Sequence, residues 1–207
     1  MAQGAIYKDC FDDDNLFGDE LVDYISQNIF KMKRYIFIDY GTVNPMVFLD
    51  VYDDNKILYV VNEYYYDSKK TGIEKTDTEY GEDLLEFVGN KSITPAYVVI
   101  DPSAASFKAL LRKKGLRGKV ADDTINADNK VLEGIRHVSS LLKKKMLLFH
   151  KDNCKNTISE MKSYVWDDKA LKNQAKEKPL KIADHGPDAV RYGCFTLINP
   201  RRYNSAS

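Results

Sequence analysis

The chain has 207 residues, 43% of them hydrophobic and 30% charged, which is the balance of one globular domain with a sizeable core. Its 31 basic and 31 acidic side chains give a formal net charge of zero, which excludes a protein drawn to nucleic acid by its overall field. Any DNA binding must therefore come from local patches, or from a larger assembly that holds the substrate.

The number of cysteines and the hydropathy of the sequence indicate the cellular compartment of the protein. Cys10, Cys154 and Cys194 have neither metal-ligand spacing nor an even count, so we interpret them as thiols in a reducing compartment. No signal peptide is recognisable, and no apolar run approaches the ~18 residues of a membrane span. These features predict a soluble, intracellular protein.

Residues 1–33 are predicted to lead into the fold, with a short helix over Leu21–Phe30. Regular structure then begins with three runs rich in aromatic and β-branched residues, which predict strands over Arg34–Tyr40, Met46–Tyr52 and Ile57–Tyr66. The Asp/Asn-containing segment 53–56 suits a tight hairpin between the second and third strands. These short connections predict an antiparallel meander.

Helices and strands are expected to alternate over the rest of the chain. We predict strands over Ala96–Ile100 and Gly118–Ala121, and helices over Thr76–Val88, Ser103–Lys114, Asn129–Lys145, Asn156–Tyr164 and Pro187–Ile198. Asp77 or Thr78 is placed to cap the first of these helices. Met146–Phe149 is a brief apolar segment, and 166–181 is expected to be an exposed loop or hairpin. The pattern predicts an α/β fold, with one mixed sheet of an antiparallel meander plus parallel strands, flanked by helices.

Two of the apolar strands lead directly into an aspartate, Asp39 and Asp101. Because the second strand is reached through a helical crossover, it can run parallel to the first and beside it, so that both carboxylates emerge at one edge of the sheet. Asp188 adds a third carboxylate in the first turn of the last helix. Three acidic groups so placed can hold a pair of divalent metal ions, the arrangement that phosphodiester cleavage needs.

Each of these carboxylates also has a structural interpretation. Asp39 can be a turn former at a strand end, although Gly41 leaves room for a ligand or for backbone beside it. Asp101 can cap a helix that starts at Pro102, and Asp188 can favour the positive end of a helix dipole. We prefer a shared site because all three residues lie on elements that can converge.

Other polar residues are weaker candidates. His185, three residues before Asp188, can bind a metal, orient a water molecule or protonate a leaving oxygen. Asp184 can be a further ligand or can support one. His137 and His150 are interpreted as structural. Glu63 and Glu86 are interpreted as surface residues, with a fourth metal ligand as the alternative.

Three basic segments also need an interpretation. Lys143–Lys145 suit the C-terminal end of a helix, where positive charge is favourable. The segment 113–119 is a candidate contact for phosphate groups. The lysine-rich stretch 169–181 is a candidate hairpin that gates the access of DNA.

Four blocks stand in a specific order: Gln3–Phe11 (QGAIYKDCF), Phe37–Pro45 (FIDYGTVNP), Val99–Ser103 (VIDPS) and Asp184–Tyr192 (DHGPDAVRY). Together the last three resemble the nuclease domain of the large terminase subunit of tailed bacteriophages and prophages. The first is similar to the junction that follows the ATPase domain in those proteins. The resemblance covers nearly the whole chain.

The resemblance implies a ribonuclease H-like fold over residues 34–207, and a sequence-tolerant endonuclease that cuts concatemeric double-stranded DNA to start and end genome packaging. Asp39, Asp101 and Asp188 match the metal-binding acids of the family, and His185 matches a histidine often found near them. The implied cofactors are two Mg²⁺ or Mn²⁺ ions. Gly186-Pro187 departs from the usual pattern, and a helix that begins at Pro187 leaves His185 in the preceding turn.

The resemblance also implies partners: double-stranded DNA, a terminase ATPase domain in cis before the linker 1–33, the terminase small subunit and the portal protein, all in the host cytoplasm. The sequence lacks the G-x-x-x-x-G-K-[ST] loop of a packaging ATPase. We therefore expect a domain from a longer polypeptide, with a nuclease that never had a motor as the alternative.

Three other functions fit parts of the pattern. Residues Asp39–Thr42 are similar to the phosphate loop of actin-like ATPases and sugar kinases, but the sequence has neither the second loop nor the glycine-rich adenosine site that those enzymes need. A ribonuclease H-like junction resolvase would share the fold and the metals but prefer branched DNA. A catalytically inactive DNA-binding or scaffolding module is the third alternative.

Overall fold

The computed structural model describes residues 4–89, 91–113, 124–127, 129–167 and 177–197. Its strands are β1 Leu16–Phe17, β2 Lys33–Asp39, β3 Met46–Asp53, β4 Leu58–Tyr66, β5 Tyr97–Ile100, β6 Thr124–Asn126 and β7 Leu147–His150. Its α-helices are α1 Asp19–Asn28, α2 Ser68–Thr71, α3 Asp77–Val88, α4 Ala105–Lys113, α5 Val131–Lys143, α6 Lys155–Ser163 and α8 His185–Leu197. Two 3₁₀ turns, η1 Asp13–Asn15 and η2 Ile29–Lys31, flank α1 and the short strand before it.

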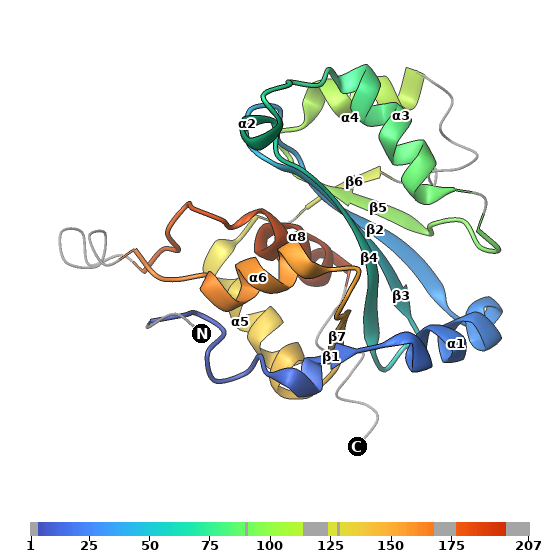
Figure 1. Ribbon diagram of the computed structural model, residues 1–207, viewed down its shortest axis with the longest axis vertical. Coiled ribbons are helices and arrows are strands. Elements are labelled where there is room, and N and C mark those ends of the chain that lie inside the picture. Colours follow the sequence, from blue (N-terminus) through green and yellow to red (C-terminus); the bar gives the residue numbers. More distant parts are fainter. Residues whose placement is uncertain (1–3, 90, 114–123, 128, 168–176, 198–207) are drawn as a thin grey trace.

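The described strands form one sheet in the order β1-β7-β4-β3-β2-β5-β6 (Figure 1). Strands β2, β3 and β4 form the predicted antiparallel meander, while β5 runs parallel to β2 and β7 parallel to β4. Helices α3 and α4 cover one face of the sheet, and α5, α6 and α8 cover the other (Figure 1). The predicted fold class is confirmed. Among the described helices, none combines the length and the apolar character needed to cross a bilayer.

Strand β2 is buried on both faces, and its side chains alternate between two cores. Tyr35 and Phe37 belong to the core under α5, α6 and α8, whereas Ile36 and Ile38 belong to the core under α3 and α4. This explains why the strand is a continuous apolar run. Since side chains alternate along a strand, Asp39 emerges on the same face as Phe37, which is the face that α8 covers.

The predicted adjacency of the two aspartate-bearing strands is confirmed. Ile38 on β2 is paired in parallel with Ile100 on β5, and the backbone N–H of Asp101 donates to the carbonyl of Ile38. Val99 belongs to the same core as Phe37, so Asp101, two residues further on, also lies on the α8 side of the sheet. The two carboxylates therefore leave the sheet at one edge and on one face.

Helix α8 lies very close to β2 because it carries a glycine at the contact. A Cβ atom built on Gly193 would lie only 2.1 Å from Cγ of Phe37. No larger residue fits there without moving the helix away from the strand. This contact sets the depth at which α8 presents its polar N-terminal turns to the sheet edge.

Two local expectations need correction. The cap of α3 is Thr76, which forms a capping box with Glu79, and neither Asp77 nor Thr78 takes that role. Helix α8 begins at His185, two residues before the predicted start at Pro187, because proline is tolerated anywhere in a first turn where the N–H groups have no helical partner. Strand β6 was not predicted, and the predicted strand 118–121 lies outside the described residues.

The described part of residues 1–33 packs against the same fold. Strand β1 pairs in parallel with β7, and the side chains of Tyr7 and Phe11 are buried in the core beneath α5, α6 and α8. The predicted helix in this segment is present as α1. A segment that contributes this many buried aromatic groups adds stability to the domain.

The Gly193 contact predicts that alanine destabilises the protein at this helical glycine but not at another. Gly193→Ala should lower the free energy of unfolding by about 1–3 kcal/mol, because the methyl group clashes with the rigid ring of Phe37. Gly81→Ala in α3 is the matched control. Its methyl group meets only Cδ2 of Leu110 at 3.2 Å, so the helix propensity of alanine should make it neutral or stabilising by up to ~1 kcal/mol. Urea unfolding followed by circular dichroism measures both, and equal effects would contradict the packing argument.

Candidate functional site

The residues predicted for a metal site line one cavity of about 340 Å³ at the sheet edge. Asp39 comes from the end of β2, Asp101 from the end of β5, and His185 and Asp188 from the first turn of α8. Residues as far apart in the sequence as Asp39 and Asp188 are thus brought together by the packing of α8 on β2 and β5. The cavity is completed by Tyr40, Asn44, Lys181, Asp184 and Tyr192.

Asp39 is buried and is bound to His185, with 2.9 Å between Oδ2 and Nδ1. Burial raises the pKa of Asp39 to about 7, and the negative charges of Asp188 and Asp101 add to this rise while the bond to His185 opposes it. Burial lowers the pKa of His185, but the bond to Asp39 and its charge outweigh burial and leave that pKa raised. The Asp39–His185 pair therefore retains protons that the separated side chains would lose.

Asp101 makes one local and one long-range contact. Its Oδ1 accepts from the backbone N–H of Ser103 at 2.7 Å, and its Oδ2 accepts from the hydroxyl of Tyr192 on α8 at 3.3 Å. Because α4 begins at Ala105, Asp101 does not cap that helix as the structural interpretation had it. Tyr192 links the end of β5 to α8, so the carboxylate is directed into the cavity.

Asp188 is surrounded by positive charge. Its Oδ1 accepts from Nη2 of Arg191 at 2.9 Å, and its Oδ2 accepts from Nζ of Lys181 at 2.6 Å. The same lysine nitrogen lies 2.9 Å from Oδ2 of Asp184. An ammonium group thus stands between two carboxylates, which shows that the cavity accommodates a cation at this point.

The described side chains do not form a ready-made ion cage. Among them, no three carboxylate, imidazole or thiol groups are close enough together to enclose one metal ion. In each of Asp39, Asp101 and Asp188, at least one carboxylate oxygen is hydrogen-bonded to another group of the protein. Small side-chain rotations within the cavity would have to exchange those donors for an ion.

Several residues that shape the site had no signal in the sequence. Glu160 on α6 is buried and accepts from the backbone N–H of Gly186 and from the hydroxyl of Tyr65, both at 2.6 Å. It thereby holds the first turn of α8 in place. Lys181 stood in a lysine-rich stretch that predicts an exposed segment, and only the fold brings its ammonium group to Asp188. No local pattern distinguishes these residues from surface charges.

The remaining candidates lie away from the cavity. Both oxygens of Glu63 accept from backbone N–H groups at the start of α6, and Glu86 is exposed on α3. His137 packs against Phe195 on α8, and His150 is buried 3.3 Å from an oxygen of Asp19. The two histidines and Glu86 are therefore structural or exposed, as the preferred interpretation expected, whereas Glu63 is half-buried and holds the start of α6 instead of lying free on the surface.

The glycine after Asp39 makes room for backbone. A Cβ atom on Gly41 would lie 2.4 Å from the carbonyl oxygen of Asn44 and 2.5 Å from that of Pro45. The space that it leaves is therefore filled by the loop before β3, which carries Asn44 into the cavity wall. The sequence had left open whether a ligand or the backbone takes this space.

The basic segments are described only in part. Of the candidate phosphate contact 113–119, all but Lys113 lies outside the described residues, as do positions 169–176 of the candidate gate. Trp166 and Pro179 form an antiparallel bridge, and Lys178 pairs with Asp167 at 3.7 Å. The base of the stretch 166–181 is therefore a hairpin, one of the two predicted forms.

Comparison with known proteins places this geometry in a family. Neither protein-family models nor curated proteins match the chain. Among solved structures, the large terminase of a thermophilic bacteriophage matches with a TM-score of 0.80 and 41% sequence identity, over 96% of this chain and 47% of the other. The chain thus spans about half the length of that protein.

Two isolated domains also match. The nuclease domain of the P22 large terminase has a TM-score of 0.60 and 16% identity, over 84% of this chain and 83% of its own. The large terminase nuclease domain of bacteriophage SPP1, solved with bound manganese, has a TM-score of 0.58 and 15% identity, over 87% of this chain and 96% of its own. The chain therefore belongs to the large terminase family and has the ribonuclease H-like fold of its nuclease domains.

Proposed function

We propose that this domain is the metal-dependent endonuclease of a phage DNA-packaging terminase, and that it cuts concatemeric double-stranded DNA by phosphodiester hydrolysis. The observation that carries the proposal is the convergence of Asp39, Asp101 and Asp188 on one cavity, in a chain of this family. The manganese bound to the SPP1 nuclease domain supports a divalent metal as the cofactor.

The residues of the cavity suit two Mg²⁺ or Mn²⁺ ions. Asp39, Asp101 and Asp188 offer the carboxylate oxygens that hard divalent cations prefer, with His185 and Asp184 beside them. The ammonium group of Lys181 already occupies a cation position between Asp184 and Asp188. When bound, divalent ions make hydroxide available from water at neutral pH and stabilise the charge that develops on the departing oxygen.

The protein's own groups hold the carboxylates for this task. His185 orients Asp39, Tyr192 orients Asp101, and Arg191 fixes one oxygen of Asp188 while the other accepts from Lys181 at the cavity wall. Glu160 holds the turn that carries His185 through the N–H of Gly186. Outer contacts of this kind determine how well carboxylates and imidazoles bind metal.

The proposal extends to the rest of the packaging machine. Residues 1–33 would connect the nuclease fold, residues 34–207, to an ATPase domain in cis, while packing against that fold through β1, Tyr7 and Phe11. Terminase small subunit and portal protein are the proposed partners, and the host cytoplasm is the proposed site of action. The matching large terminase is about twice as long as this chain, which supports a further domain.

Asp39→Asn and Asp101→Asn should each abolish the cutting of supercoiled and linear DNA in Mn²⁺ or Mg²⁺, because each removes a charge from the metal site without changing the size of the side chain. Gel assays and circular dichroism measure activity and folding. Asp23→Asn, an exposed residue on α1, is the control and should cut normally. Retained cutting by either site variant would remove the basis of the proposal, and a preference for branched DNA in the wild type would favour a junction resolvase.

His185→Ala should lower the rate of cutting by roughly 10–100-fold, less than the aspartate variants, because His185 acts mainly by orienting Asp39. His185→Gln keeps a donor for Asp39 and should retain more activity. Rates are measured over a series of Mn²⁺ concentrations, and the loss should shrink as the metal concentration rises. Identical metal dependence in wild type and His185→Ala would assign the residue a purely structural role.

The raised pKa values of Asp39 and His185 predict how stability changes with pH. Both groups bind protons more tightly in the folded protein, so their contribution is present at low pH. That of Asp39 is lost as pH rises through about 7, and that of His185 as pH rises through its raised pKa. In EDTA, the melting temperature should therefore fall between pH 5.5 and 8, and Mn²⁺ should restore it more at pH 8 than at pH 5.5. Asp39→Asn should flatten the pH dependence in EDTA. An unchanged slope in that variant would contradict the assignment.

A further inference from the structure

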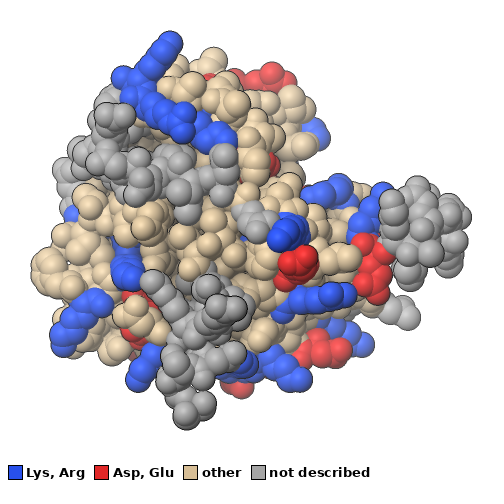
Figure 2. Space-filling model, turned by 180° about the vertical axis from the view of Figure 1, so that it is seen from behind, with Lys and Arg blue, Asp and Glu red and all other residues tan. Residues whose placement is uncertain are grey.

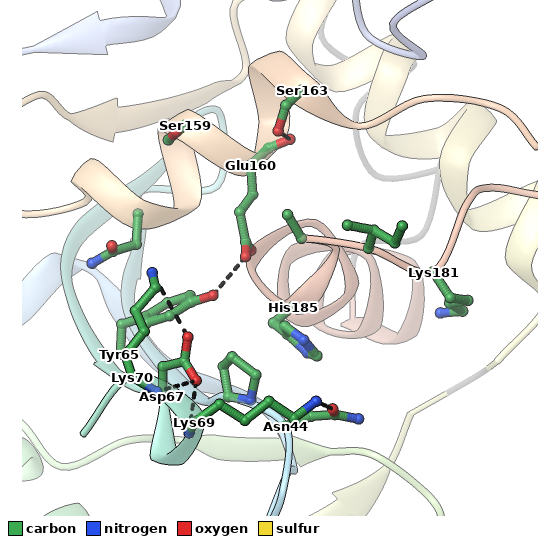
Figure 3. Close-up of a pocket in the computed structure, with 14 residues that line it drawn as sticks. Asn44, Tyr65, Asp67, Lys69, Lys70, Ser159, Glu160, Ser163, Lys181 and His185 are labelled. Atoms are coloured by element: carbon green, nitrogen blue, oxygen red, sulfur yellow. Dashed lines mark hydrogen bonds and ion pairs between the residues drawn. The ribbon is translucent and has the colours of Figure 1, made fainter. Parts of the chain in front are cut away.

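A second cavity, of about 460 Å³, is lined in part by Lys181 and His185 (Figure 3) and adjoins the acidic one. The two cavities share Asn44, Lys181 and His185 in their walls. The second cavity lies between α6 on one side and α2 with the loop before β3 on the other. The three shared residues therefore form the wall between two neighbouring cavities.

The walls of the second cavity carry three lysines, Lys69, Lys70 and Lys181. Lys69 and Lys70 are exposed on α2, so their ammonium groups remain hydrated and available to a ligand. Nζ of Lys69 donates to the side chain of Asn44 at 3.0 Å, which places one positive charge at the junction of the two cavities. Exposed Ser159 on α6 lies across the cavity from these lysines (Figure 3), and exposed Asn156 on the same helix also lines the cavity.

The two acidic groups of this wall are engaged with protein donors. Oδ1 of Asp67 accepts from the backbone N–H groups of Lys69 and Lys70, and Asp67 pairs only loosely with the ammonium group of Lys70, at 3.7 Å. Both oxygens of Glu160 accept from groups of the domain, as described above. The ion pair between Lys70 and Asp67 contributes little energy because Lys70 is solvent-exposed. Lys70 can therefore readily pair with another anion instead.

We propose that this second cavity is a phosphate subsite, in which Lys69 and Lys70 bind a DNA backbone phosphate close to the one that is cleaved. The inference rests on the proposed nuclease function and identifies where the domain holds its substrate. A strand that approaches Asp39, Asp101 and Asp188 is repelled by their charge, so cations are needed beside the acids. Lys69 and Lys70 supply that charge next to the wall that both cavities share.

The distribution of charge over the rest of the molecule favours this location. The formal net charge is zero, and the face shown in Figure 2 carries both basic and acidic side chains. DNA binding therefore depends on a local concentration of lysines. Among the described cavities, the one beside the acids combines three lysines with polar donors from a facing helix.

The test measures binding of a 20-base-pair duplex by fluorescence anisotropy in EDTA over a series of salt concentrations. The double variant Lys69→Gln/Lys70→Gln should bind more weakly at low salt. Its slope of log affinity against log salt concentration should be shallower by about 1 for each lysine that contacts a phosphate. Lys69→Arg/Lys70→Arg keeps the charges and should retain the slope of the wild type.

Lys56→Gln is the matched control, since Lys56 is an exposed lysine in the β3–β4 turn, at the opposite end of the sheet from Asp39. It should keep both affinity and slope. In Mn²⁺, the glutamine double variant should show a raised KM for plasmid with little change in kcat, and its Mn²⁺ affinity measured by calorimetry should equal that of the wild type.

The outcomes separate this inference from the proposed function. If the glutamine double variant keeps the wild-type slope and KM while the wild type cuts DNA, the phosphate subsite is overturned and the nuclease function stands. If the wild type neither binds nor cuts DNA, the proposed function itself fails. A slope that falls equally in Lys56→Gln would show diffuse attraction and would also overturn the subsite.

Discussion

The contact between α8 and β2 is the constraint on which the site depends. Gly193 allows the helix to lie directly on the ring of Phe37, and Phe37 shares its face of β2 with Asp39. Once the helix is seated there, its first turn reaches the sheet edge, where His185 meets Asp39 and Tyr192, further along the helix, meets Asp101. The catalytic geometry proposed for this domain is therefore a consequence of core packing, and a single added methyl group would disturb it.

The electrostatics of the cavity follow from this packing. Bringing buried carboxylates together is unfavourable, and the protein offsets the cost with the positive groups of Lys181 and Arg191 and with the imidazole of His185. Burial, with a smaller contribution from the charges of Asp188 and Asp101, nevertheless raises the pKa of Asp39. An environment of this kind favours the binding of further cations, which gives the proposed metal dependence a physical basis in the residues themselves.

Two adjoining cavities of unlike charge have different proposed roles. The acidic cavity would hold metal ions, and the lysine-lined cavity would hold the backbone of the substrate. Lys181 belongs to both walls, and its ammonium group now rests between Asp184 and Asp188. If metal binds as proposed, an ion would displace this ammonium group, and the binding of metal would then be linked to the charge of the neighbouring cavity.

Local sequence patterns were sufficient to predict most of the strands and the neighbouring positions of two site residues. Apolar runs identified β2, β3, β4 and β5, and the rule for crossover connections placed Asp39 beside Asp101. The predictions of helix caps and helix starts were less accurate, as Thr76 and the start of α8 show. Neighbouring residues of similar propensity compete for the end of a helix. Strand β6 is only three residues long, too short for a periodic signal.

The sequence by itself determined the strand-end aspartates, the parallel pairing that joins two of them and the family resemblance, because each of these is encoded in contiguous residues. Only the tertiary structure decided that Glu160 supports the turn at Gly186, that Lys181 neutralises Asp188, and that a lysine-lined cavity adjoins the acids. These features join side chains on different elements, and their positions follow from how closely helices approach the sheet, which no local periodicity records.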